Sequence, residues 1–116
     1  MTVRNPVLLT PTHNCLLAAL SVEVLDRLLP SLEIVQMPLG KVIYESGIEL
    51  KHVYFPTPGC IVSLLYVMEN GSSAEIAVVG DEGLVGIALF MGGGTTPSRA
   101  LVQSAGEAFR LEAKAM

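Results

Sequence analysis

The sequence predicts a mainly β fold with flanking helices, of the sandwich or barrel kind. Short runs of β-prone residues alternate with turn residues at spacings of about 8–12 residues over most of the chain. Ahead of them, leucines and valines recur at three- and four-residue spacing, which is the period of an amphipathic helix. The length of 116 residues suits one domain with its own core. We therefore expect a single domain over residues 1–116.

The helical part is expected over residues 14–32, which read NCLLAALSVEVLDRLLPSL. Asn14 and Ser21 each stand before an apolar-periodic run, and both residue types are favoured helix N-caps. Pro30 lies near the end of the second run, where it disfavours a longer helix. The sequence therefore predicts two short helices that meet near Ser21.

The β part is expected over residues 33–112. Its predicted strands are 33–37, 41–44, 52–55, 61–68, 73–79, 99–103 and 108–111. Asn70-Gly71 separates two of them and is a strong hairpin signal. Glu75 lies in the middle of the second hairpin strand, where we expect it to pair across the hairpin.

Composition narrows the classes of function. The net charge is −4, and the seven Lys and Arg are scattered, so no positive stripe for nucleic acid is predicted. Cys15 and Cys60 lack CxxC spacing and are expected to be two buried free thiols in a reducing, cytoplasmic protein. The uncharged run 83–98 is broken by three consecutive glycines, two threonines and a proline, so no membrane span is expected there. The first twelve residues hold only a short apolar patch between prolines, so no targeting segment is expected.

Apolar residues make up 51% of the chain, and the mean hydropathy is +0.56. Such a composition is rich for a small domain: either an apolar surface meets a partner, or the domain is part of a longer ancestral chain whose other half once covered that surface. We therefore expect a homodimer or another form of self-association.

One stretch, residues 80–100, interrupts the β pattern and reads GDEGLVGIALFMGGGTTPSRA. It holds glycines, an apolar run suited to a short helix near 84–91, and a lone arginine. Glycines let the backbone approach a ligand, amides at a helix start face an anion, and arginine binds phosphate with paired hydrogen bonds. The stretch is therefore a candidate phosphate cradle.

Several blocks in this order resemble one family. They are NCLLAAL, RLLPSLE, PLGKVIYESG, VYFPTPGCIVSLL and ENGSSAEIAVVGDEGLVG. Together they resemble the cyclic-nucleotide-binding sensor domain of Crp/Fnr-type bacterial transcription regulators. The resemblance implies a double-stranded β-helix, a jelly-roll-like β-roll, behind two short N-terminal helices. It also implies effector sensing and dimer contacts without enzymatic activity.

In that family a long dimerisation helix and a helix-turn-helix DNA-binding domain follow the sensor. Here the sequence stops at Met116, where the long helix would begin. The resemblance therefore implies a sensor truncated before its DNA-binding domain, with no DNA binding by this chain alone.

The family's cassette reads roughly Gly-Glu-Leu-Gly and falls on Gly83-Leu84-Val85-Gly86, so Leu84 stands where the ribose-binding glutamate is expected. The family's Arg-Ser-Ala element falls on Ser98-Arg99-Ala100, so Ser98 stands at the arginine position. Arg99 is shifted by one residue, which in a strand turns a side chain to the opposite face. Either Arg99 bends toward an anion or it is a surface residue. Glu82 is interpreted as a solvated loop charge.

The candidate anion cradle follows from this comparison. It comprises Gly83, Leu84, Val85, Gly86, Ile87, Ser98 and Arg99. Because the two specific side chains are replaced, we expect cyclic AMP and cyclic GMP to bind weakly or not at all. Any effector is then a small anion of unknown identity, and no cofactor is expected.

Two other functions remain open. The chain is alternatively a ligand-free dimerisation or interaction module. A more remote alternative is a cupin-like enzyme, which needs clustered histidines, whereas His13 and His52 are far apart in the sequence. No metal site is therefore predicted, and no serine has a nearby histidine to activate it.

Overall fold

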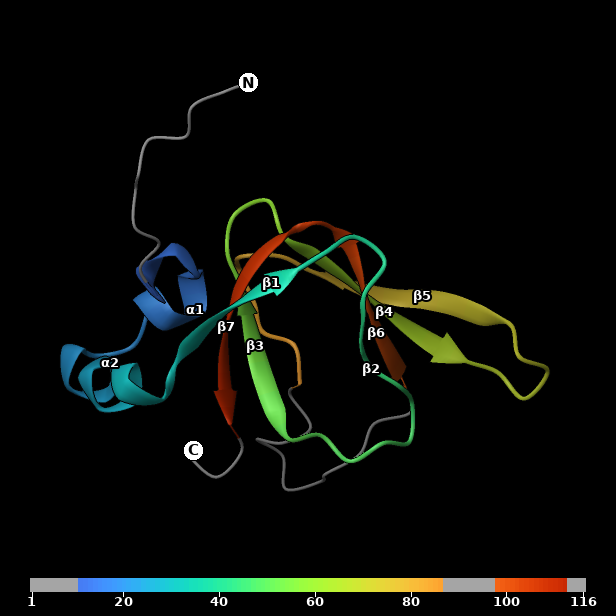
Figure 1. The fold of residues 1–116 in the computed structure, drawn as a ribbon, viewed down its shortest axis with the longest axis horizontal. Coiled ribbons are helices and arrows are strands. Elements are labelled where there is room, and N and C mark those ends of the chain that lie inside the picture. The colour runs from blue at the N-terminus through green and yellow to red at the C-terminus, as the bar shows by residue number, and fades with distance from the viewer. Residues whose placement is uncertain (1–10, 87–97, 113–116) are drawn as a thin grey trace.

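The computed structural model describes residues 11–86 and 98–112 (Figure 1). The described elements are η1 Pro11–His13, α1 Cys15–Ala18, α2 Val22–Leu28, η2 Leu29–Ser31, β1 Glu33–Met37, β2 Val42–Tyr44, β3 His52–Pro56, β4 Ile61–Val67, β5 Ser73–Val79, β6 Ser98–Ser104 and β7 Gly106–Glu112. The predicted strands are all present. β1 and β5 have the predicted bounds, and the other strands differ from the prediction by one or two residues at their ends.

The strands form two antiparallel sheets. One has the order β1-β7-β3, and the other has the order β2-β6-β4-β5. The first four strands alternate between the sheets along the chain, as in a jelly roll. Figure 1 shows α1 and α2 beside the three-stranded sheet, while the β4–β5 hairpin projects on the opposite side of the molecule. This architecture confirms the predicted β-roll with two short N-terminal helices.

β7 is the middle strand of the three-stranded sheet. It pairs with β1 through Glu33 opposite Arg110, and with β3 through Tyr54 opposite the same arginine. β7 is also the last described strand of the chain. The sheet is therefore held together by the strand farthest along the sequence.

The core has two clusters. The first lies inside the roll and consists of Met37, Cys60, Val62, Val85, Ala100, Val102 and Ala108. The second joins α1 to the three-stranded sheet and consists of Leu17, Val53, Phe55, Phe109 and Leu111. Full burial of each large apolar side chain contributes about 1.5–3 kcal/mol. Leu17 is the buried residue of α1, so this one leucine anchors the first helix to the roll.

Both predicted helix caps are confirmed. The Asn14 side chain accepts hydrogen bonds from the backbone N–H groups of Leu16 and Leu17, and Ser21 accepts one from Val24. These caps satisfy N–H groups that the first turn of a helix leaves without partners. The helices meet at Ser21, as the sequence predicts, and Pro30 lies in η2 directly after α2.

The expectation for the two cysteines is half wrong. Both thiols are free, and Cys60 is buried, but Cys15 is exposed. Cys15 is the first residue of the four-residue helix α1, and its backbone N–H donates to the carbonyl of Asp81. The side of this short helix that packs on the roll is taken by Leu17, so Cys15 points elsewhere. Burial raises the pKa of the Cys60 thiol above its usual value.

The predicted β4–β5 hairpin is confirmed. Gly71 has a φ of +87°, a left-handed conformation that glycine adopts without strain, and Asn70 accepts a hydrogen bond from the Ser72 amide. Glu75 pairs across the hairpin, because its carboxylate accepts a 2.8 Å hydrogen bond from the Ser63 hydroxyl. The register shifts by one residue between Leu64 and Leu65.

Candidate functional site

The glycine-rich turn that follows β5 begins at Gly80. The Gly83 amide donates to the Gly80 carbonyl, and the Glu82 carboxylate accepts from the Gly80 amide at 2.9 Å. Glu82 is exposed, and hydrogen bonds from the backbone amides of Gly80 and of Glu82 itself lower its carboxyl pKa. Glu82 is thus a loop charge that stabilises the turn, and it does not point into the roll's core clusters.

Leu84 is half-buried against the second core cluster, beside Phe55 and Leu111. Val85 is fully buried and forms an antiparallel bridge with Tyr54. The two residues exchange both backbone hydrogen bonds, at 2.8 and 2.9 Å. The Val85 amide is therefore already satisfied within the protein and is not free for an anion.

Gly86 is the tightest point of the candidate cradle. Its φ is +105°, and an added Cβ would lie 2.9 Å from the His52 carbonyl oxygen and 3.3 Å from the Val53 Cα. Only glycine fits so close to the backbone of β3 in this conformation. A short helix is expected near residues 84–91. Of that range, the described residues 84–86 hold the Val85 bridge, while Ile87 and the rest lie outside the described residues.

Ser98 and Arg99 lie on opposite sides of β6. Ser98 is 5% exposed and its side chain is hydrogen-bonded to Tyr44, whereas the Arg99 guanidinium makes a 2.7 Å ion pair with Glu45. The Arg99 side chain is 35% exposed. The inward position at the start of β6 is therefore occupied by a small neutral side chain, and the cation is held on the other face by a carboxylate.

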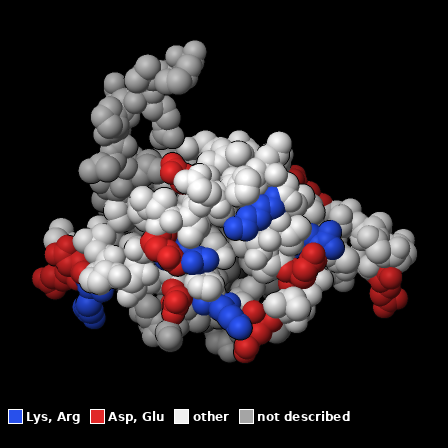
Figure 2. Space-filling model, in the orientation of Figure 1, with Lys and Arg blue, Asp and Glu red and all other residues white. Residues whose placement is uncertain are grey.

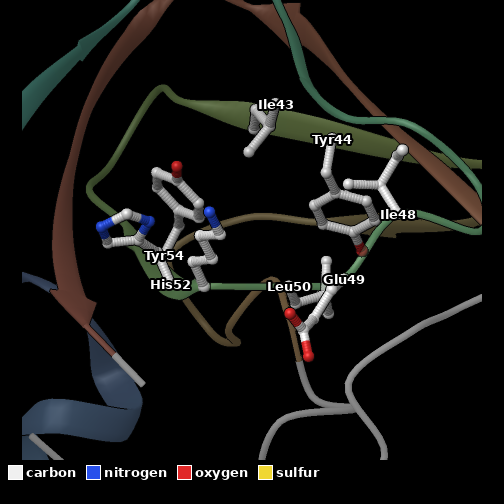
Figure 3. A pocket seen from close by; sticks show the side chains of 8 residues that line it. Ile43, Tyr44, Ile48, Glu49, Leu50, His52 and Tyr54 are labelled. Atoms are coloured by element: carbon white, nitrogen blue, oxygen red, sulfur yellow. The ribbon is translucent and has the colours of Figure 1, made fainter. Parts of the chain in front are cut away.

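A cavity between the two sheets was not predicted from the sequence. It has a volume of about 300 Å³ and is lined by Ile43 and Tyr44 of β2, by His52 and Tyr54 of β3, and by residues 48–51 of the loop between these strands. Figure 3 shows the Tyr44 ring on one side and the His52 and Tyr54 rings on the other. The lining strands belong to different sheets, and the loop that joins them along the chain completes the cavity.

Burial raises the pKa of the Tyr44 hydroxyl above its usual value, and the hydrogen bond with Ser98 offsets part of the rise. The unfolded chain ionises Tyr44 near pH 10, whereas the folded chain keeps it neutral to a higher pH. Folding stability from this residue is therefore present below pH ~10 and is lost as the pH rises toward the folded-state pKa.

We accordingly expect Tyr44→Phe to flatten the fall in unfolding free energy between about pH 9 and 11, measured by urea titration. At neutral pH Tyr44→Phe should lower the free energy of unfolding by about 1 kcal/mol, because the hydrogen bond between Tyr44 and Ser98 is lost. Tyr66→Phe, at an exposed ring, is the matched control and should leave both values unchanged. An equally steep alkaline fall in Tyr44→Phe would contradict the assignment.

Other kinds of site find little support in the described residues. No group of three or more His, Cys, Asp or Glu is arranged to hold a metal ion within residues 11–86 and 98–112. None of the helices in the described ranges is both long enough and apolar enough to cross a membrane. On the face shown in Figure 2, Lys and Arg lie next to Asp and Glu, so their fields partly cancel there.

The fold matches several solved structures. The sensor domain of the transcriptional regulator DNR from Pseudomonas aeruginosa is 23% identical, with a TM-score of 0.69 over 89% of this chain and 67% of that one. The N-terminal domain of a transcriptional regulator from Streptomyces coelicolor is 24% identical, with a TM-score of 0.72 over 89% of this chain and 73% of that one. The regulatory domain of a Toxoplasma gondii protein kinase A, solved with cAMP, is 13% identical, with a TM-score of 0.76 over 90% of this chain and 42% of that one.

No family model matches the sequence, and no curated protein matches it. These solved structures are sensor or regulatory domains, and the catabolite activator protein of Thermus thermophilus, 22% identical with a TM-score of 0.70 over 91% of this chain and 47% of that one, is a further match. The chain therefore has the β-roll fold that the sensor domains of Crp/Fnr-type transcription regulators share with cyclic-nucleotide-binding regulatory domains.

Proposed function

We propose that this chain is the effector-sensing domain of a Crp/Fnr-type transcription regulator, and that it binds neither cyclic AMP nor cyclic GMP tightly. It acts through ligand-dependent packing, without catalysing a reaction. The fold and the regulators among its structural neighbours support this assignment.

The observation that carries the proposal is the placement of Ser98. A phosphate inside the roll needs a cation on the inward side of β6, and Ser98 takes that side while its hydroxyl is engaged with Tyr44. Arg99 is paired with Glu45 on the other face. Leu84 packs among apolar side chains and offers no carboxylate for a ribose hydroxyl.

The energetic consequence is large for a cyclic nucleotide. A partly buried phosphate without a paired cation is unfavourable by several kcal/mol. Leu84 lies in the second core cluster beside Phe55 and Leu111, so position 84 offers no carboxylate to a ribose hydroxyl, and an unpaired hydroxyl costs a further ~1–3 kcal/mol. Since about 1.4 kcal/mol is tenfold in affinity, the two losses together move a micromolar ligand to millimolar or weaker.

Calorimetric titration with both nucleotides tests the proposal. We expect no binding tighter than about 1 mM for the natural chain, and a gain of tenfold or more in Ser98→Arg, which places a cation on the inward side of β6. Arg99→Ala is the matched control and should change neither result, because Glu45 already holds that guanidinium.

A dissociation constant of about 10 µM or tighter for the natural chain would refute the proposal. If that binding also fell in Arg99→Ala, the shifted arginine would be the phosphate ligand. The unfolding temperature of each variant shows whether a missing gain comes from a misfolded protein.

A second candidate function is a ligand-free dimerisation or interaction module. It is favoured by a groove of about 440 Å³ whose lining residues are all apolar, among them Leu20, Val24 and Leu84. In this case the domain works as a homodimer contact, and the cavity between the sheets has no role. A ligand in that cavity decides between the two candidates.

A further inference from the structure

The cavity between β2 and β3 has aromatic walls. Tyr44 comes from the four-stranded sheet, and His52 and Tyr54 come from the three-stranded sheet. The His52 and Tyr54 rings lie side by side, with centroids 6.2 Å apart and planes tilted by 51°. Figure 3 shows Tyr44 facing them across the cavity. Such ring faces attract cations and pack well against apolar groups.

The charged groups of the cavity come from its loop. Glu49 and Lys51 both line it, and both residues are exposed. They carry opposite signs, two residues apart. A ligand with a single charge is attracted by one of them and repelled by the other, whereas a ligand with both charges is attracted by both.

The remaining lining is apolar. Ile43, Ile48 and Leu50 complete it, and Leu50 is only 5% exposed. The volume of about 300 Å³ lies at the lower end of the range for small-molecule sites. The cavity therefore suits a small ligand that carries an apolar group in addition to charges of both signs.

We propose that this cavity binds an α-amino acid with an apolar side chain. Its carboxylate is held by Lys51, its ammonium group by Glu49 and the face of a tyrosine ring, and its side chain by Ile43 and Leu50. This inference rests on the proposed function, because it names the class of effector that the sensor domain binds.

The chain contains its own reporter for this site. It has three tyrosines and no tryptophan, and two of the three, Tyr44 and Tyr54, line the cavity. In Tyr66→Phe the tyrosine emission comes from these two residues alone. We expect L-phenylalanine to change that emission saturably, with a dissociation constant of about 1 mM or tighter.

Matched ligands and variants separate the two charge contacts. 2-Phenylethylamine lacks the carboxylate and 3-phenylpropionate lacks the ammonium group, and each should bind at least about tenfold more weakly than L-phenylalanine. Lys51→Met and Glu49→Gln should each weaken L-phenylalanine by a similar factor. Lys41→Met removes an exposed charge that does not line the cavity and should leave binding unchanged.

Three results would overturn the inference. They are the absence of a saturable change up to about 10 mM, equal binding of either half-analogue, and unchanged binding in both charge variants. Any of these, with cyclic nucleotides still excluded by calorimetry, removes the amino-acid assignment and leaves the proposed function standing. Micromolar binding of cyclic AMP overturns the proposed function whatever L-phenylalanine does.

Discussion

Replacing Asn14 with alanine is expected to lower the free energy of unfolding by about 3 kcal/mol. The Asn14 side chain is fully buried and makes four hydrogen bonds. Its oxygen caps α1, and its amide nitrogen donates to the carbonyls of Pro56 at 2.8 Å and Gly83 at 2.9 Å. Loss of the cap costs about 1 kcal/mol, and two buried carbonyls without donors add more.

Two further variants separate these contributions in urea unfolding experiments. Asn14→Asp keeps the capping oxygen but directs a carboxylate at two carbonyls, so it should be at least as destabilising as alanine. Ser21→Ala removes an exposed cap with a single bond and should cost about 1 kcal/mol or less. If Asn14→Asp were as stable as the natural chain, the two carbonyl contacts would have no energetic weight.

Replacing Gly86 with alanine is expected to have a comparable effect, about 3 kcal/mol or more. The φ of +105° alone costs a side chain about 1–2 kcal/mol. In addition, the new Cβ would lie 2.9 Å from the His52 carbonyl oxygen, so the backbone of β3 must move. That movement would also disturb the pairing of Val85 with Tyr54.

Gly40→Ala is the matched control for this prediction. Gly40 has a φ of +83°, but an added Cβ there would meet nothing within 4 Å. Its unfolding free energy should therefore fall by about 1–2 kcal/mol, which is the conformational cost alone. If urea titration gave equal losses of unfolding free energy in Gly86→Ala and Gly40→Ala, the contact between the new Cβ and the backbone of β3 would have no energetic cost.

The sequence predicted best those features that depend on local signals. β5 has its predicted bounds because Asn70-Gly71 and Gly80-Asp81 enclose a run of β-prone residues. Asn14 was predicted as a cap for the same reason. Its two bonds to Pro56 and Gly83 were not predicted, since they span 42 and 69 residues and exist only in the closed roll.

The candidate site divides in the same way. Aligning Ser98-Arg99-Ala100 with the family's Arg-Ser-Ala element predicts a neutral residue where the family has its arginine. In the structure Ser98 points inward and Arg99 points outward. The cavity was not predicted, because a pattern of β-prone residues does not tell which strands share a sheet or whether the loop between β2 and β3 leaves space beneath it. The exposure of Cys15 was missed because a four-residue helix gives too short a pattern to fix which side is buried.

The place of β7 in the middle of its sheet has a consequence for synthesis. While the chain emerges from the ribosome, β1 and β3 have no partner, because the strand between them is made after both. Their backbone N–H and C=O groups stay open to other chains until residue 112 is outside the exit tunnel. Pairing of Glu33 with Arg110 then closes a loop over most of the described sequence, a topology that folds in about milliseconds to seconds. Aggregation during expression should therefore depend on how long translation pauses before β7, and on any chaperone that covers β1 and β3 in that interval.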